Sequence, residues 1–339
     1  MGVTAPAGRA RLERFLADVA QAEHATVLAL EPLTGGAVQE NWRLDAILEG
    51  GPYTGKQAWV LRITAPAGIP GSHSREAEFA LLKVAEKAGV PVPTPHFLCR
   101  DESVLGREFF IMERLPGIAA GHRLVRDEGL DGETLVAELG RALGRIHAIR
   151  PPRADLAFLT LPEPTPALEM VARFEAQIAA LTEPHPVLDW ALRWMALNAP
   201  EPQAIVLSHR DFRTGNYLVE KGRLAGLLDW EFANWGDPME DIGWFCAKCW
   251  RFGAVAREAG GIGSRSGFIR AYAESSGLSV DPESVHFWEV AAHLRWAVIA
   301  LQQCDRHLRG ALPSLELALT GRLAAEMELE ILALTQEPG

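Results

Sequence analysis

The chain has 339 residues, of which 48% are hydrophobic and 23% charged, a composition that supports a substantial core and excludes disordered and collagen-like proteins. Its formal net charge of −11 argues against nucleic acid as a partner. The sequence has no run of about 18 apolar residues and no apolar stretch of a signal peptide at its start, so we expect a cytoplasmic protein without a membrane span.

Four cysteines are too few for a disulfide framework in a chain of this length. Cys246 and Cys249 have the spacing of a redox or zinc motif. The segment around them reads as an apolar helix, and no second pair of ligands lies nearby. We therefore interpret them as two semi-buried helix cysteines.

Residues 1–115 predict a lobe built on an antiparallel sheet. Apolar residues at helical spacing predict an opening helix, and short β-type runs between turn residues follow it. We expect a second helix, capped by Ser72 or Ser74, to end at Gly89. The β-type runs lie at 26–30, 33–38, 41–48 and 58–63, and two more strands are expected at 96–100 and 107–114.

Residues 116–339 predict a second, mainly helical lobe, with Pro116 and Gly117 as the hinge. A β-rich island interrupts it, with a strand at 204–207 and a hairpin at 217–229. The helices are expected at 133–149, 166–181, 186–197, 238–252, 264–275, 281–304 and 312–334.

The run from His209 to Asn216, His-Arg-Asp-Phe-Arg-Thr-Gly-Asn, lies in this island. Phosphoryl transfer needs a carboxylate that orients the attacking hydroxyl and oxygen ligands that hold magnesium on the phosphates. Asp211 suits the first task, and Asn216 suits the second together with Asp229, which antiparallel hairpin strands return to the start of the hairpin. The alternative is a turn network around Ser208 that only caps a loop.

This run, followed by Asp-Trp-Glu at 229–231, resembles the aminoglycoside phosphotransferase family, kinase-like small-molecule phosphotransferases that include choline and homoserine kinases. The resemblance covers most of the chain. It implies a protein-kinase-like bilobal α+β fold. The antiparallel-sheet N-lobe, residues 1–115, would bind the nucleotide, and the mainly helical C-lobe, residues 116–339, would carry the catalytic loop, the metal site and the substrate pocket. It also implies ATP and Mg²⁺ as cofactors, Asp211 as the catalytic base-like residue, and Asn216 and Asp229 as metal ligands.

Two further residues are expected to have structural roles, Asp241 from the resemblance and His209 from its position in the loop. Asp241 ends the run Gly-Asp-Pro-Met-Glu-Asp at 236–241, which resembles the family element that braces the catalytic loop. His209 is expected to brace the same loop by hydrogen bonds and is not assigned as the base.

The first lobe supplies the expected nucleotide contacts. Gly35 and Gly36 lie between two predicted strands, where backbone N–H groups can approach phosphate oxygens, although an ordinary hairpin turn explains them equally well. Arg62 stands on the third strand, where protein kinases carry a lysine. Its expected partner is Glu78 on the following helix, with Glu76 as the competitor.

The strand at 109–115, Phe-Phe-Ile-Met-Glu-Arg-Leu, resembles the one whose backbone edge receives adenine. We assign this edge to Glu113 and Leu115. The side chains of Ile111 and Met112 are interpreted as core packing.

The acceptor is expected to be a hydroxyl of a small molecule. Arg210 and Arg213 depart from the family pattern, and an inward orientation of both would favour an anionic acceptor. An acidic second half and the family name favour a cationic aminoglycoside or a macrolide. The Asp-Trp-Glu form, Arg62 and the Trp-rich terminal helices resemble a branch that acts on hydroxyacyl-CoA thioesters. We favour an endogenous alcohol of this kind.

An alternative of another class is a nucleotide-binding pseudokinase or scaffold, for which Arg62 is the supporting feature. A protein kinase is disfavoured because Asp-Phe-Gly and Ala-Pro-Glu are missing where they would stand. A metal-dependent hydrolase is disfavoured because the histidines are scattered.

Overall fold

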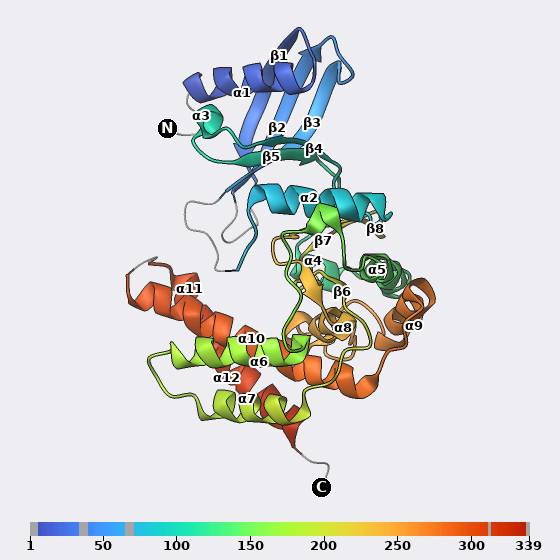
Figure 1. The fold of residues 1–339 in the computed structure, drawn as a ribbon, viewed down its shortest axis with the longest axis vertical. Helices are drawn as coiled ribbons and strands as arrows, with labels where there is room; N and C mark the ends of the chain where they lie inside the picture. The colour runs from blue at the N-terminus through green and yellow to red at the C-terminus, as the bar shows by residue number, and fades with distance from the viewer. Residues whose placement is uncertain (1–5, 34–39, 65–70, 311–312, 337–339) are drawn as a thin grey trace. The chain divides into compact units, whose positions relative to one another are not determined.

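The computed structural model describes residues 6–33, 40–64, 71–310 and 313–336 (Figure 1). The chain forms two compact units. The first unit comprises residues 1–118, 154–158 and 217–232, and the second comprises residues 119–153, 159–216 and 233–339. The hairpin after Asn216, expected in the second lobe, therefore groups with the first unit.

A five-stranded antiparallel sheet forms the core of the first unit. Along β2 (Glu40–Glu49) the side chains of Leu44, Ala46 and Leu48 alternate into the core, and helix α1 (Pro6–Val19) adds Leu12 and Leu16 to it. The predicted antiparallel sheet is confirmed. In spatial order its strands are β1 (His24–Pro32), β2 (Glu40–Glu49), β3 (Gly55–Ile63), β5 (Phe109–Glu113) and β4 (Pro95–Cys99).

Helix α2 (Arg75–Lys87) begins at Ser74, whose hydroxyl accepts a hydrogen bond from the N–H of Ala77 at 3.2 Å. Of the two serines proposed as caps, Ser74 holds this position. Gly89 follows the C-terminal end with a φ of 72°. The short helix α3 (Glu102–Leu105) and a 3₁₀ helix at Ala154–Leu156 also belong to the first unit.

The hairpin of β7 (Tyr217–Glu220) and β8 (Arg223–Leu227) turns at Lys221 and Gly222, as predicted. Both turn residues have positive φ angles, which match the twist of a tight hairpin. Backbone hydrogen bonds tie the hairpin to the first unit. Ile118 and Val219 exchange two of them, and the N–H of Leu227 donates to Pro91 at 2.8 Å. These bonds explain why the hairpin groups with the sheet unit.

The second unit is mainly helical, as predicted. Its strands β6 (Val206–Ser208) and β9 (Asn234–Gly236) pair antiparallel. The long helix α10 contacts α6, α7, α8, α11 and α12. The helices are α4 (Gly121–Arg126), α5 (Gly132–His147), α6 (Pro166–Ala179), α7 (Pro186–Asn198), α8 (Pro238–Cys246), α9 (Arg265–Ser276), α10 (Pro282–Leu308), α11 (Leu315–Thr320) and α12 (Leu323–Thr335).

Helix α8 is shorter than the predicted 238–252. The guanidinium of Arg251 donates to the carbonyl of Cys246 at 2.7 and 3.1 Å and so satisfies the last turn of the helix. A 3₁₀ helix at Lys248–Trp250 follows. Cys246 and Cys249 lie on either side of this break as free thiols. Burial raises the pKa of Cys246 to about 12, which suits the structural interpretation of this pair.

The predicted helix at 312–334 is divided into α11 and α12 around Gly321. A Cβ atom at this glycine would lie 2.6 Å from the Cβ of Cys304 on α10. The chain therefore approaches α10 closely here. Glycine permits that approach and also weakens a continuous helix.

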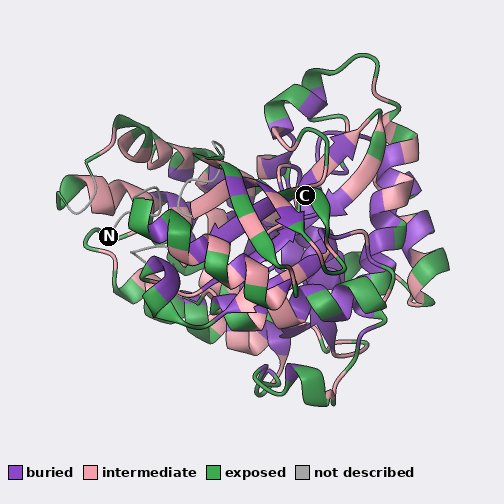
Figure 2. Cartoon of the chain, turned by 90° about the horizontal axis from the view of Figure 1, so that it is seen from above, coloured by how far each residue is buried: buried purple, intermediate pink, exposed green. Residues whose placement is uncertain are grey.

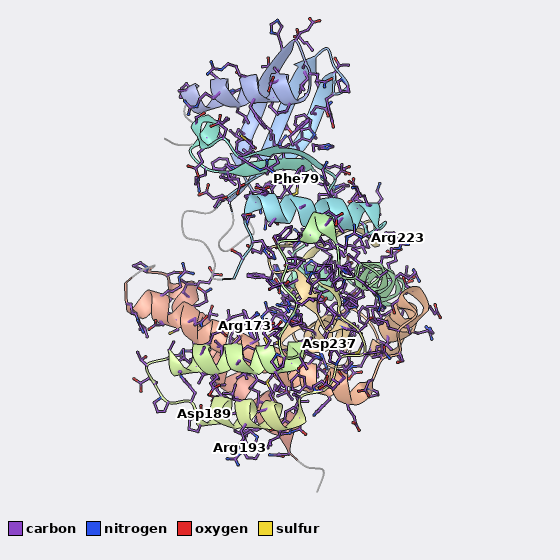
Figure 3. All side chains as sticks on the ribbon, in the orientation of Figure 1. Phe79, Arg173, Asp189, Arg193, Arg223 and Asp237 are labelled. Atoms are coloured by element: carbon purple, nitrogen blue, oxygen red, sulfur yellow. The ribbon has the colours of Figure 1, made fainter. Side chains whose placement is uncertain are left out.

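Burial within each unit follows the expected pattern, with exposed residues on the outer helix faces (Figure 2). On α7, Asp189 and Arg193 lie on the exposed face, one turn apart (Figure 3). None of the helices in the described part of the chain has the length and apolar character needed to cross a membrane.

Candidate functional site

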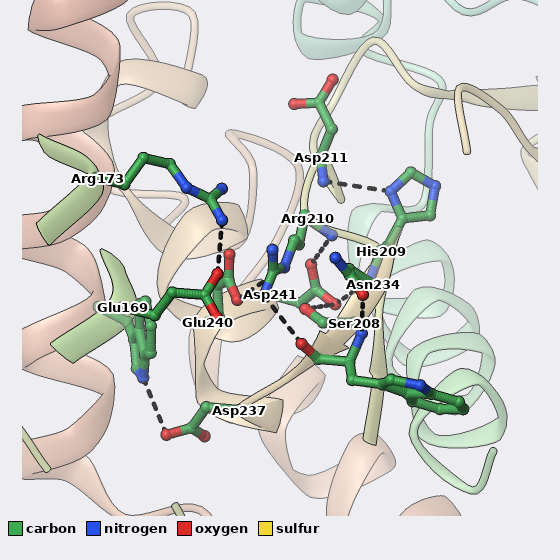
Figure 4. A network of polar contacts seen from close by, with 12 residues as sticks. Glu169, Arg173, Ser208, His209, Arg210, Asp211, Asn234, Asp237, Glu240 and Asp241 are labelled. Carbon is green, nitrogen blue, oxygen red and sulfur yellow. Dashed lines mark hydrogen bonds and ion pairs between the residues drawn. The ribbon is translucent and has the colours of Figure 1, made fainter. Parts of the chain in front are cut away.

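The loop at 209–216 is anchored by Asp241, which lies on α8 and is fully buried. Its carboxylate accepts hydrogen bonds from the backbone N–H groups of His209 and Arg210, each at 2.7 Å, and from the hydroxyl of Ser208 at 2.9 Å (Figure 4). The ring of His147 lies 3.1 Å away. Burial alone would raise the pKa of Asp241, but these partners hold it below its ordinary value. A buried carboxylate thus fixes the loop backbone.

His209 and Arg210 lie at the start of the loop. The Nδ1 atom of His209 accepts from the N–H of Asp211 at 3.3 Å. Arg210 has a φ of 61°, a strained conformation for a non-glycine residue. Its buried guanidinium donates to the carbonyl of Trp235 and lies 3.4 Å from Glu240. Arg210 therefore faces the interior of the helical unit.

Asp211 carries a carboxylate with three side-chain donors around it. Trp244 donates its indole N–H to Oδ1 at 3.0 Å, and Arg213 donates Nε to the same oxygen at 3.2 Å. Asn216 donates its amide N–H₂ to Oδ2 and, at 3.0 Å, to the backbone carbonyl of Asp211. The carboxylate is thereby oriented by fixed donors, with 14% of its side chain exposed.

Tryptophan and arginine side chains stack beside this carboxylate. The guanidinium carbon of Arg213 lies 4.5 Å from the ring centre of Trp250, and that of Arg295 lies 4.4 Å from the ring centre of Trp244. The two indole rings are 5.1 Å apart. Arg295, on α10, also donates to the carbonyl of Arg210.

No sequence pattern pointed to Trp244 or assigned Arg295 to the site. Trp244 lies 33 residues from Asp211, and Arg295 lies 85 residues from Arg210. Their positions depend on the packing of α8 and α10. The one available signal was the abundance of tryptophan and arginine in the terminal helices.

In the first unit, Arg62 is buried on β3 and contacts Glu78 at 2.9 Å. It also contacts the Oδ1 atoms of Asp229 at 3.0 Å and of Asn41 at 3.3 Å. Burial opposes the charged form of Arg62, but Glu78 and Asp229 raise its pKa overall. Glu76 pairs instead with Arg100 on the surface. Of the two proposed partners, the structure brings Glu78 to Arg62.

A third carboxyl group, Glu231, joins this cluster. It is buried, and burial together with the nearby charges of Glu78 and Asp229 raises its pKa to about 7, while Arg62 and Arg75 oppose the rise. Glu231 had no role in the sequence interpretation beyond the Asp-Trp-Glu form.

The other predicted nucleotide contacts have mixed outcomes. Gly35 and Gly36 lie outside the described residues. The N–H of Glu113 donates to the carbonyl of Thr94 at 2.9 Å, so an adenine contact at Glu113 would have to use its carbonyl. Leu115 packs its side chain near Gly226 of the hairpin.

The side chains of Asn216 and Asp229 can be compared with the ligands that magnesium prefers. Mg²⁺ prefers oxygen ligands such as carboxylate and amide carbonyl groups. The amide nitrogen of Asn216 faces Asp211, so its Oδ1 atom points to the other side of the amide. The carboxylate of Asp229 is 36% exposed, and its φ of 59° is strained. Within the first unit it pairs with Arg62, whose other carboxylate partner is Glu78. Each of the two residues thus offers an oxygen atom of the kind that Mg²⁺ binds.

The sheet unit, the helical unit and the braced Asp–Asn loop define the class of kinase-like phosphotransferases. The chain belongs to the phosphotransferase enzyme family, whose model matches residues 29–278. This match confirms the predicted enzyme class, a small-molecule phosphotransferase.

Solved structures show the same fold. A candidate aminoglycoside phosphotransferase of Ralstonia eutropha is 23% identical, with a TM-score of 0.75 over 97% of this chain and 99% of that chain. Spectinomycin phosphotransferase, in complex with ADP and spectinomycin, is 13% identical, with a TM-score of 0.58 over 98% of this chain and 100% of that chain. The predicted kinase-like fold is confirmed.

Curated relatives belong to a differently named group. Acyl-CoA dehydrogenase family member 10 of Mus musculus is 28% identical over 286 residues, which are 77% of this chain and 26% of the relative. Family member 11 of Gallus gallus is 29% identical over 308 residues, which are 82% of this chain and 38% of the relative. The chain thus spans a quarter to two fifths of the length of these two relatives.

Proposed function

We propose that the protein transfers the γ-phosphoryl group of ATP to a hydroxyl group of a small molecule, an endogenous alcohol such as a hydroxyacyl-CoA. The observation that carries this proposal is the carboxylate of Asp211, oriented by Trp244, Arg213 and Asn216 on a loop braced by Asp241. Such a carboxylate has the properties needed to align an attacking hydroxyl.

Asp211 accepts a hydrogen bond from the acceptor hydroxyl and takes its proton as the oxygen attacks the γ-phosphorus. A new oxygen–phosphorus bond forms while the bond between the γ-phosphorus and the bridging oxygen breaks. ADP leaves with that oxygen and its electron pair. Arg62, and the backbone at Gly35 and Gly36, would steady the leaving diphosphate, and the carbonyl of Glu113 and the backbone of Leu115 would meet adenine.

Asn216 and Asp229 are the proposed magnesium ligands. They flank the β7–β8 hairpin in the chain. A bound magnesium ion supplies charge neutralisation on the nucleotide phosphates. Arg62 holds Asp229 by a partly buried ion pair, so this ligand is oriented from within the first unit.

Two observations favour an acyl-type alcohol as the acceptor. The guanidinium groups of Arg213 and Arg295 lie beside the catalytic carboxylate, a setting that repels ammonium groups. The curated relatives carry the name acyl-CoA dehydrogenase family. The alternative is an antibiotic kinase for an aminoglycoside or a macrolide, supported by the names of the similar structures.

A nucleotide-binding scaffold is the alternative of another class. It predicts nucleotide binding without turnover on any alcohol. The complete set of Asp211, Asn216 and Asp229 favours the enzyme.

The experiment is a screen for ATP consumption with magnesium against aminoglycosides, macrolides, choline-like amines and hydroxyacyl-CoA thioesters. We expect turnover with a hydroxyacyl thioester and a loss of about a hundredfold or more in kcat for Asp211→Asn, because the variant cannot accept the proton. The matched control is Asp189→Asn on the exposed face of α7. Unchanged turnover in Asp211→Asn would contradict the proposal, and turnover only with aminoglycosides or macrolides would favour the antibiotic alternative.

A further inference from the structure

Arg213 and Arg295 approach the catalytic carboxylate from different elements of the helical unit. Arg213 follows Asp211 by two residues, and Arg295 lies on α10. Each guanidinium lies over an indole face, that of Trp250 for Arg213 and that of Trp244 for Arg295. An arginine that is stacked on a ring keeps its N–H edges for hydrogen bonds in the plane of the guanidinium. The two edges are therefore positioned before any ligand binds.

Both arginines are tied to the catalytic loop. Arg213 donates Nε to Asp211 at 3.2 Å, and Trp244, the ring beneath Arg295, donates to the same oxygen at 3.0 Å. Arg295 donates to the carbonyl of Arg210, the residue before Asp211. An acceptor whose hydroxyl meets Asp211 therefore brings its neighbouring atoms toward these guanidinium groups.

A small pocket beside Arg295 adds a second observation. Its wall combines apolar side chains with one acidic and one basic group, and it is formed by Met170, Phe174, Glu240, Trp244, Trp288, Ala291, Ala292 and Arg295. Glu240 is buried and lies 3.4 Å from Arg210, so its charge has a partner within the helical unit. Arg295 at this wall suits a polar oxygen of a bound acceptor.

We propose that Arg213 and Arg295 hold the carbonyl or carboxylate oxygen of a hydroxyacyl acceptor, a few bonds from the hydroxyl that Asp211 aligns. The inference rests on the proposed function and adds the residues that select the acceptor. The guanidinium groups donate hydrogen bonds to the acyl oxygen, which remains unchanged in the reaction. The same charges disfavour acceptors that carry ammonium groups near the hydroxyl.

The first test varies the acceptor with the wild-type protein. The probes are 3-hydroxybutyryl-CoA, free 3-hydroxybutyrate and 1,3-butanediol, which keeps the hydroxyl but lacks the carbonyl. We expect turnover with the thioester or the acid and at least a tenfold lower kcat/KM with the diol. A higher kcat/KM for 3-hydroxybutyryl-CoA identifies the bound oxygen as a thioester carbonyl, and a higher kcat/KM for 3-hydroxybutyrate identifies it as a free carboxylate. Equal kcat/KM for the diol overturns the inference while leaving the proposed function standing.

The second test varies the protein, with the better of the two acyl probes. For Arg295→Gln we expect the KM for the acceptor to rise roughly 10- to 100-fold with the KM for ATP unchanged, because one hydrogen bond from a charged donor is lost. Arg295→Lys keeps the positive charge but lacks the planar guanidinium group, so its acceptor KM should lie between those of the wild type and Arg295→Gln. Arg193→Gln on the exposed face of α7 is the matched control.

Three results separate the explanations. An unchanged acceptor KM in folded Arg295→Gln, or a rise in the KM for ATP in place of the acceptor KM, overturns the acceptor role of Arg295. The thermal unfolding midpoint of each variant shows whether it is folded. If Arg295→Gln does not fold, the acceptor KM of Arg295→Lys tests the same role. Absence of ATP turnover by the wild type with every alcohol in the screen contradicts the proposed function itself.

Discussion

At the scale of single residues, Trp244 shows how a side chain outside the recognised motif controls the catalytic group. Its indole N–H donates to Asp211, and its ring supports Arg295. Donation to one carboxylate oxygen fixes the rotation of the carboxyl group. Trp244 is therefore a positioning residue for Asp211.

The variant Trp244→Phe removes this hydrogen bond while keeping an aromatic ring. We expect kcat to fall roughly 10- to 100-fold with little change in the KM for ATP, because a hydrogen bond to a charged group contributes about 1.5–3 kcal/mol. The control is Trp190→Phe, which also loses an indole hydrogen bond, to Thr335 at 2.8 Å, away from the loop. Steady-state kinetics of both variants distinguishes them, and equal kcat values would speak against positioning by Trp244.

Sequence patterns identified the residues that lie close together along the chain. Asp211 and Asn216 stand on one loop, and Asp241 was assigned because the run at 236–241 resembles the family element that braces the catalytic loop. Trp244 and Arg295 reach the loop only through the packing of α8 and α10. A tryptophan or arginine on a helix has no local mark that tells a catalytic neighbour from a core or surface position.

At the scale of elements, the ends of helices differed most from prediction. Helix α8 ends at Cys246 because Arg251 takes its last carbonyl, and the terminal helix breaks at Gly321 where it meets Cys304. Both endings depend on contacts with other parts of the fold. The strands of the sheet were easier to predict because turn residues separate their β-type runs.

The cluster around Arg62 joins β3, α2 and the segment after β8, and it predicts a pH-dependent stability. Glu231 has a pKa raised to about 7 from an ordinary 4.5. The folded protein therefore holds this proton more tightly than the unfolded chain. The resulting stabilisation is fully present below about pH 4.5 and is lost as the pH rises through about 7, a change of about 3 kcal/mol.

The variant Glu231→Gln has no titrating proton at this position. Its free energy of unfolding should therefore change less with pH between about 4.5 and 7 than that of the wild type. Urea unfolding at pH 5, 6, 7 and 8 measures it, with the free energy of unfolding of the wild type falling relative to the variant across this range. Glu76→Gln, a surface position on α2, should leave the pH dependence of the wild type in place. Parallel curves for the wild type and Glu231→Gln would show that Glu231 does not titrate in this window.

At the scale of the whole molecule, the chain divides differently from the two continuous lobes predicted. The sheet unit takes residues 217–232 from beyond the catalytic loop, so Asp229 belongs to the first unit and Asn216 to the second. The sequence order could not show this, because the assignment depends on the backbone bonds of the hairpin to Pro91 and Ile118.

The proposed role of Asp229 as a metal ligand predicts how nucleotide and metal affect unfolding. A ligand that binds only the folded protein stabilises it by about 2.7 kcal/mol at a hundredfold excess over its Kd. We expect ATP with magnesium to raise the thermal unfolding midpoint more than ATP with a chelator. The difference should vanish in Asp229→Asn, because the amide lacks the charge that binds the metal. Asp189→Asn should keep the wild-type difference. Because the assay measures unfolding without turnover, it tests the metal ligand independently of the acceptor. A magnesium-dependent shift that persists in Asp229→Asn would show that residues other than Asp229 bind the metal.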